Sequence, residues 1–99
     1  MSIEFLSVAE EEFRKAVFYY NQQSAGLGYE FALEVERTLE RILQYPKAWT
    51  SLSENTRRCR TNRFPFGLIY QIRPEKILIL AVMHLHREPN SWKNRIQSE

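Results

Sequence analysis

The run Ile77–Met83 limits the possible folds more than any other segment, because all seven of its residues are apolar. A run of this length is far too short to cross a bilayer, so it belongs inside a folded domain. Alternation along an extended strand places two sets of residues on opposite faces: Leu78, Leu80, Val82 and His84 on one, and Ile77, Ile79, Ala81 and Met83 on the other. Because both faces are apolar, the segment Lys76–His84 predicts a central strand that is covered on both sides.

The first half of the chain has the residue spacing of helices. Ser7 and Glu10 form the pattern of a capping box, which predicts a helix that begins at Ser7 and ends near Gly26. Its apolar face is expected to contain Val8, Phe13, Ala16, Val17 and Tyr20. A second helix is predicted from Leu27 to Tyr45, where Pro46 ends it, with an apolar stripe that consists of Leu27, Phe31, Val35, Leu39, Ile42 and Leu43. The short connector between the two predicts an antiparallel helical hairpin.

From Arg57 onward the apolar residues alternate instead, as they do in strands. Strands are predicted at Arg57–Thr61, Gly67–Arg73 and Lys76–His84, with a tight turn at Pro74-Glu75 between the last two. Residues 3–6 are expected to form a short opening strand, and a polar tail from about Pro89 either frays or forms a short helix. The 99 residues are therefore expected to form one α+β domain of order β-α-α-β-β-β, a helical hairpin packed on a small, mainly antiparallel sheet.

Charge is divided unevenly along the chain. Residues 1–50 carry five basic and eight acidic side chains, a net of −3, whereas residues 51–99 carry nine basic and four acidic ones, a net of +5. This division indicates a polyanion or an acidic partner for the second half, and the alternative is chance segregation on a solvated surface. The single cysteine, Cys59, excludes an internal disulfide, and residues 1–4 lack the features of a secretory signal, so a cytoplasmic protein is expected.

Two basic clusters lie at the ends of neighbouring predicted strands. Arg58 and Arg60 share one strand face and Arg63 follows them, while His84, His86 and Arg87 follow the last strand. Together they predict a functional basic face that contains Arg58, Arg60, Arg63 and Arg87. Guanidinium groups bind phosphate or carboxylate, and a histidine can transfer a proton near neutral pH. The face therefore suits either docking on an acidic protein or metal-free RNA cleavage by His84, His86 and Arg87. Solvated strand arginines and hydrogen-bonded structural histidines are the alternatives.

Several site classes are absent from the sequence. It contains no glycine-rich phosphate loop, no serine nucleophile elbow and no paired acidic site, and the acidic residues concentrate on the predicted helices, away from the basic strands. Two histidines and one cysteine do not suggest a metal site, so neither a metal nor another cofactor is expected. Trp49 and Trp92 are expected to pack against the core, with base stacking by Trp92 beside Arg87 as an alternative.

These features occur in an order that resembles the RelE/ParE superfamily of toxins from bacterial type II toxin–antitoxin systems, over almost the whole chain. The matching pieces are Tyr19-Tyr20, Gly26-Leu27-Gly28, Tyr45-Pro46, Arg57-Arg58, residues 64–70, residues 79–84, and His86-Arg87 with Pro89 and Trp92. The resemblance implies a small growth-inhibiting toxin that is neutralised by an antitoxin encoded beside it. An acidic, amphipathic antitoxin segment that becomes ordered on binding fits the +5 charge of the second half.

The resemblance leaves two targets open. ParE-like members inhibit DNA gyrase, whereas RelE-like members cut mRNA on the ribosome without a metal. RelE-like enzymes carry an arginine where this chain has Gly67, and their catalytic tyrosine falls near Trp92 or Lys93; only Arg87 matches their arginine after the last strand. Residues 64–66 and the segment from His86 to Trp92 resemble the ParE-like, plasmid-stabilisation branch. The sequence therefore favours a gyrase inhibitor, with a metal-independent, ribosome-dependent mRNA endoribonuclease as the alternative.

Overall fold

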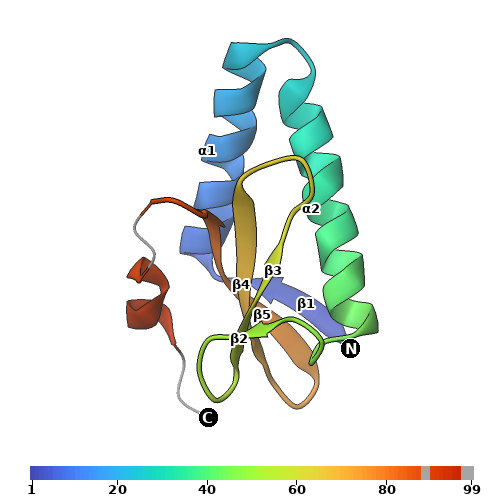
Figure 1. The fold of residues 1–99 in the computed structure, drawn as a ribbon, viewed down its shortest axis with the longest axis vertical. Helices are drawn as coiled ribbons and strands as arrows, with labels where there is room; N and C mark the ends of the chain where they lie inside the picture. Colours follow the sequence, from blue (N-terminus) through green and yellow to red (C-terminus); the bar gives the residue numbers. More distant parts are fainter. Residues whose placement is uncertain (88–89, 97–99) are drawn as a thin grey trace.

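In the computed structural model, which describes residues 1–87 and 90–96, a helical hairpin packs on one face of a five-stranded sheet (Figure 1). The elements in chain order are β1 (Ser2–Phe5), α1 (Ser7–Gln23), α2 (Leu27–Gln44), β2 (Thr50–Ser51), β3 (Thr56–Arg60), β4 (Phe66–Ile72), β5 (Lys76–His84) and the 3-10 helix η1 (Ser91–Arg95). The strand order is β1-β5-β4-β3-β2, and only the β1–β5 pair is parallel. The predicted α+β class is confirmed.

The sequence pattern did not fully predict two parts of the chain. Strand β2 was not predicted, because two residues are too few to show alternation. The polar tail contains η1, so its described part takes the helical alternative. Pro89, where the tail was expected to begin, and residues 97–99 lie outside the described residues.

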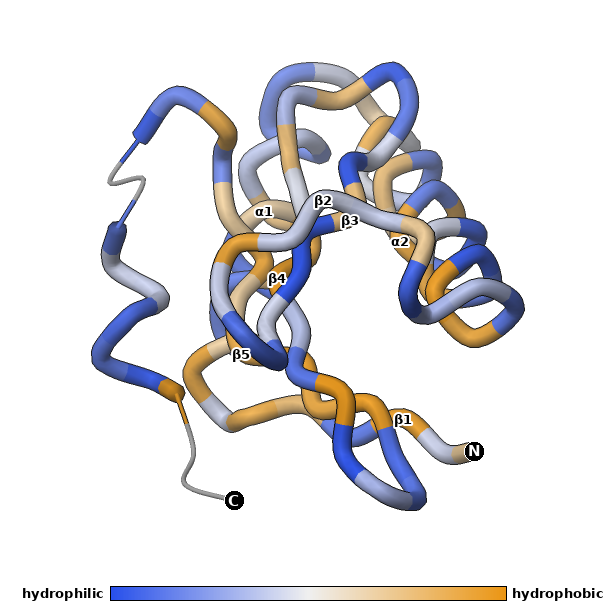
Figure 2. The backbone as a smooth tube through the Cα atoms, turned by 60° about the horizontal axis from the view of Figure 1, so that its bottom comes forward, coloured by the Kyte–Doolittle hydropathy of each residue, from blue (hydrophilic) through white to orange (hydrophobic). Residues whose placement is uncertain are grey.

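Strand β5 is the central strand that its sequence predicts. It lies between β1 and β4, and all of its residues from Ile77 to Met83 are buried. The helices cover one face, where Ile77 and Ile79 join the larger core, and η1 covers the other, where Leu78 and Leu80 pack with Trp92. In Figure 2 the tube is coloured as hydrophobic along most of β5. The apolar character of both faces is therefore explained by two separate covers.

The predicted division of β5 between the two faces is wrong in its second half. Tyr70 pairs with Ile79 but Ile69 pairs with Ala81, so Leu80 is an extra residue, a β-bulge. A bulge shifts the alternation by one residue. Val82 consequently packs in the helix-side core, whereas Ala81 and Met83 pack on the η1 side. The bulge therefore also brings His84 to the helix side, beside the ring of Phe66.

An aromatic cluster joins the helical hairpin to the connection between β3 and β4. The contacting rings of Tyr20, Phe31, Phe64 and Phe66 have centroids 4.9 to 6.1 Å apart and lie mostly edge to face. Such geometry adds about 0.5–1.5 kcal/mol per pair beyond the area that is buried. Residues 64–66 are therefore fixed against the helices. No helix in the described part of the chain is long and apolar enough to span a membrane.

Three helical details differ from the prediction. Val8 and Leu43 are exposed, and Ala9 is buried in place of Val8. The capping box does not form, because Leu6 occupies the N-cap position and makes no side-chain capping bond. The N–H of Leu6 donates to the carbonyl of Ile79, so the chain passes from β1 directly into α1 and Ser7 is already helical.

The two helices approach closely at Gly28. An ideal Cβ at this position would lie 2.6 Å from Cγ of Asn21 and would also overlap the carbonyl oxygen of Val17. The backbone N–H of Gly28 donates to Oδ1 of Asn21 at 2.8 Å, which ties the start of α2 to α1. A residue without a side chain is therefore required at this contact.

Replacing Gly28 with alanine is expected to lower the free energy of unfolding by about 1–3 kcal/mol, because the added methyl group meets backbone as well as a side chain. Urea denaturation followed by circular dichroism measures this. Tyr29→Ala is the matched control, since Tyr29 is the next residue and is 66% exposed. Its free energy of unfolding should change by no more than about 0.5 kcal/mol. Equal stabilities of Gly28→Ala and the unmodified chain would contradict the close approach.

Candidate functional site

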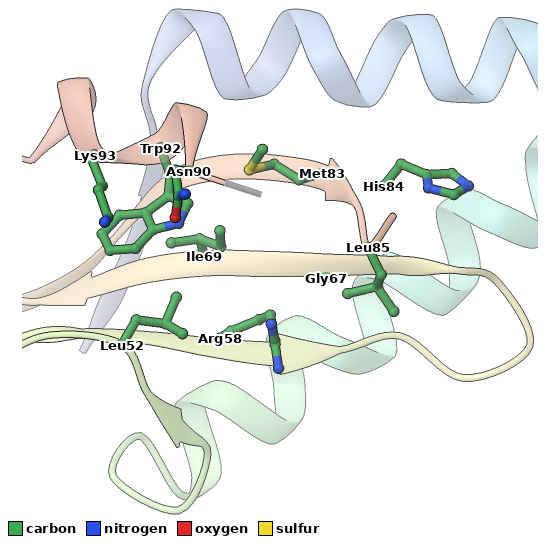
Figure 3. A pocket seen from close by; sticks show the side chains of 10 residues that line it. All are labelled: Leu52, Arg58, Gly67, Ile69, Met83, His84, Leu85, Asn90, Trp92 and Lys93. Carbon is green, nitrogen blue, oxygen red and sulfur yellow. The ribbon is translucent and has the colours of Figure 1, made fainter. Parts of the chain in front are cut away.

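The face of the sheet that the helices leave open contains a cleft of about 330 Å³ beside η1. We call it the open-face cleft (Figure 3). Its apolar lining comes from Leu52, Ile69, Met83, Leu85 and Trp92, and its polar groups come from Arg58, His84, Asn90 and Lys93. An apolar surface with two cations is suited to a partner that presents an anionic group next to an apolar one.

Arg58 is positioned in this cleft by the absence of a side chain at Gly67 on the neighbouring strand β4. A Cβ at residue 67 would lie 3.1 Å from Cγ and 3.2 Å from Cδ of Arg58. Nε of Arg58 is buried and has no hydrogen-bond partner, and among the described residues the guanidinium forms no ion pair. An unpaired buried donor is costly, and a charged one more so. An incoming carboxylate or phosphate would remove that cost.

An ion pair between Glu12 and Arg95 holds η1 against β5. The Arg95 guanidinium donates to both carboxylate oxygens of Glu12, at 2.8 and 3.0 Å, and to the carbonyl of Leu80 at 3.1 Å. The same carboxylate accepts the backbone N–H of Val82 at 3.1 Å. β1 ends opposite Ile79, so these two side chains bond to β5 just past the end of its parallel partner. The ion pair thus connects α1, β5 and η1.

The expectation that acidic residues stay away from the strands is wrong. Besides Glu12, Glu34 is buried on α2 and accepts the backbone N–H of Asn62 at 3.0 Å. Glu30 pairs with Arg63 at 2.8 Å. Glu30 and Glu34 therefore hold the connection between β3 and β4 against α2. No sequence signal separates Glu12 from the two glutamates before it, because adjacent glutamates look alike until the helix face is known.

The predicted basic residues fall into separate places. Arg58 lines the open-face cleft, and Arg60, two residues further along β3, is exposed. Arg63 turns to the helical side, where it pairs with Glu30 and lies over the Phe64 ring, 5.2 Å from its centroid. Arg87 lines a second hollow, between α1 and the ends of β4 and β5. The single basic face that the sequence predicts is therefore divided.

The end of β5 lies between the two hollows. Met83 and His84 line both of them. His84 lines both hollows while its ring lies beside Phe66 on the helix side, whereas Arg87 lines only the second hollow.

His84 is held in a form that suits binding more than proton transfer. Its Nδ1 accepts the backbone N–H of His86 at 3.1 Å, so in this arrangement the ring's proton is on Nε2. Desolvation by burial, then the positive charge of Arg87 and the neighbouring His86, lower the pKa of His84. At neutral pH the imidazole is therefore uncharged and its basic nitrogen is already occupied. The cations in the open-face cleft are Arg58 and Lys93.

The two tryptophans have the packing roles that were expected. Trp92 is 5% exposed and belongs to the core on the η1 side, which excludes base stacking by its ring in this conformation. Trp49 packs against the helix-side core, and its Nε1 donates to the carbonyl of Arg41 at 3.3 Å.

The family model described as ParE toxin of the type II toxin–antitoxin system, parDE, matches residues 3–89 of this chain. The chain belongs to the ParE toxin family.

A solved structure has the same fold as this ParE-family chain. It comes from a chromosomal ParDE toxin–antitoxin system of P. aeruginosa and superposes with a TM-score of 0.75, covering 87% of this chain and 97% of the other. The two share 14% sequence identity, so the likeness concerns the fold. The comparison with curated proteins gives no match.

The pKa of His84 in this ParE-family toxin is expected below its ordinary value of 6.5. Arg87→Ala should raise that pKa, because it removes a positive charge that disfavours the imidazolium. A pH titration of the ring resonances by NMR measures both values. Arg63→Ala is the matched control and should leave the titration unchanged, since Arg63 is paired with Glu30 and is not among the charges that act on His84. A His84 pKa above 6.5 in the unmodified chain would contradict this environment.

Proposed function

We propose that this ParE-family chain is a growth-inhibiting toxin that binds DNA gyrase in the cytoplasm and is neutralised by an antitoxin encoded beside it. The observation that carries the proposal is the Arg58 guanidinium in an apolar cleft, whose buried Nε has no hydrogen-bond partner among the described residues. Such a group gains most from an anionic acceptor on a macromolecular surface, because contact with that surface also excludes water from the cleft.

The chemistry of the cleft supports binding over RNA cleavage. Metal-free cleavage needs a base for the 2′-OH, cations for the phosphate and an acid for the leaving oxygen. Gly67 supplies no side chain, the indole of Trp92 is buried, and Nδ1 of His84 already accepts a hydrogen bond. Arg58 and Lys93 can bind a phosphate but do not supply proton transfer, which contributes about 10²–10⁴-fold to such reactions.

An antitoxin partner is supported by the family and by the charge distribution. The structural neighbour comes from a ParDE toxin–antitoxin system. Residues 51–99, with their net charge of +5, contribute the cleft's two cations, Arg58 and Lys93. We propose that an acidic, amphipathic antitoxin segment covers part of this half and becomes ordered on binding. Its affinity should therefore fall as salt concentration rises.

Two assays on the purified toxin separate the targets. The toxin is expected to inhibit supercoiling by gyrase and to leave ribosome-bound mRNA intact. Arg58→Gln should weaken gyrase inhibition by about 10- to 100-fold, because a hydrogen bond to a charged group contributes roughly 1.5–3 kcal/mol. Arg63→Gln, whose arginine is already paired on the helical side, is the matched control and should retain inhibition. Circular dichroism establishes that both variants are folded.

Efficient cleavage of mRNA in the ribosomal A site, abolished by replacing His84 or His86, would overturn the gyrase proposal. It would assign the chain to the endoribonuclease branch, with Arg58 and Arg60 as phosphate ligands. Undiminished gyrase inhibition by Arg58→Gln would instead remove the open-face cleft from the site of action.

A further inference from the structure

A second hollow lies between α1 and the ends of β4 and β5, with a volume of about 560 Å³. We call it the α1 groove. The residues of interest on its walls are Lys15, Tyr19, Tyr20, Phe66, His84 and Arg87. We propose that the α1 groove binds single-stranded nucleic acid, with bases stacked on its rings and phosphates bound by Lys15 and Arg87. This activity goes beyond gyrase inhibition and does not depend on it.

A continuous series of rings lines the groove. Tyr19 contacts Tyr20 with ring centroids 5.3 Å apart, Tyr20 lies 6.1 Å from Phe66, and Phe66 lies 5.4 Å from His84. Tyr19 is 51% exposed. Aromatic rings along a groove let successive bases stack without regard to sequence.

The groove also carries a positive balance of charge. Lys15 and Arg87 are exposed, and among the described residues neither forms an ion pair, so both are available to phosphates. Glu12 is the one acidic residue on the described walls, and its carboxylate is bound by Arg95 at 2.8 and 3.0 Å and by the N–H of Val82. The negative charge of Glu12 is therefore offset.

The rings distinguish between kinds of anionic partner. His84 is a flat, uncharged surface at neutral pH and lies beside the ring of His86, 5.7 Å between centroids. Aromatic side chains in such a groove stack with bases, because every base has a π-face. An acidic peptide would match the charge alone. The combination of rings and cations therefore favours single-stranded nucleic acid.

Fluorescence anisotropy with a labelled oligothymidylate of about 12 nucleotides, within the site sizes common for such grooves, tests the proposal. Tyr19→Ala should weaken binding by roughly 5- to 150-fold, the effect of losing one stacked base, and Tyr19→Phe should restore it. Arg87→Ala should weaken binding and reduce the slope of log affinity against log salt by about one. The control Tyr29→Ala removes a comparably exposed tyrosine from α2 outside the groove and should leave the affinity unchanged.

Three outcomes would overturn the proposal. The first is no binding of the oligonucleotide at low salt. The second is equal loss of affinity in Tyr19→Ala and Tyr29→Ala, which would make the attraction a matter of general charge. The third is tight binding of a polyglutamate peptide that the oligonucleotide does not displace, which would assign the groove to an acidic protein. Gyrase assays on the same variants keep this test separate, because Arg58→Gln should retain oligonucleotide binding.

Discussion

The rest of the structure depends on one requirement: β5 is apolar on both faces, so each face needs its own cover. The α1–α2 hairpin covers one face and η1 covers the other. Because η1 is only five residues long, it covers that face incompletely and leaves the open-face cleft beside it. The bulge at Leu80 then turns Val82 and His84 toward the helices. Both hollows therefore meet at the end of a single strand, with Met83 and His84 between them.

Carboxylates determine which cations remain available. Glu12 binds Arg95 and thereby fastens the smaller cover, and Glu30 occupies Arg63. Arg58 has no comparable partner among the described residues, and Gly67 gives its side chain room to lie across β4. Some basic side chains in the second half of the sequence are therefore paired with glutamates, and others remain available to a partner. The available cations are Arg58 and Lys93 in the open-face cleft and Arg87 in the α1 groove. Lys15 of α1 is a further cation in that groove.

Local patterns in the sequence predict the architecture well. The change from helical to alternating spacing near Arg57 identifies the α+β class, and Pro46 ends the second helix where expected. The details that depend on long-range pairing are not predictable in this way. The bulge at Leu80 arises from the register between β4 and β5, and no residue type in that run marks it. The positions of Arg63 and Arg87 on the helical side follow from contacts with α2 and α1, so strand alternation alone placed them too close to Arg58.

The most direct test concerns the Glu12–Arg95 ion pair, which we expect to hold η1 against β5. The side chains of Arg95 and Glu12 are 17% and 26% exposed and form two hydrogen bonds. Their coupling should therefore be well above that of a surface pair. A double-mutant cycle with Glu12→Gln and Arg95→Gln, using free energies of unfolding in urea, measures it. We expect a favourable coupling of about 1–3 kcal/mol, whereas single effects that add within about 0.3 kcal/mol would contradict this role of the pair.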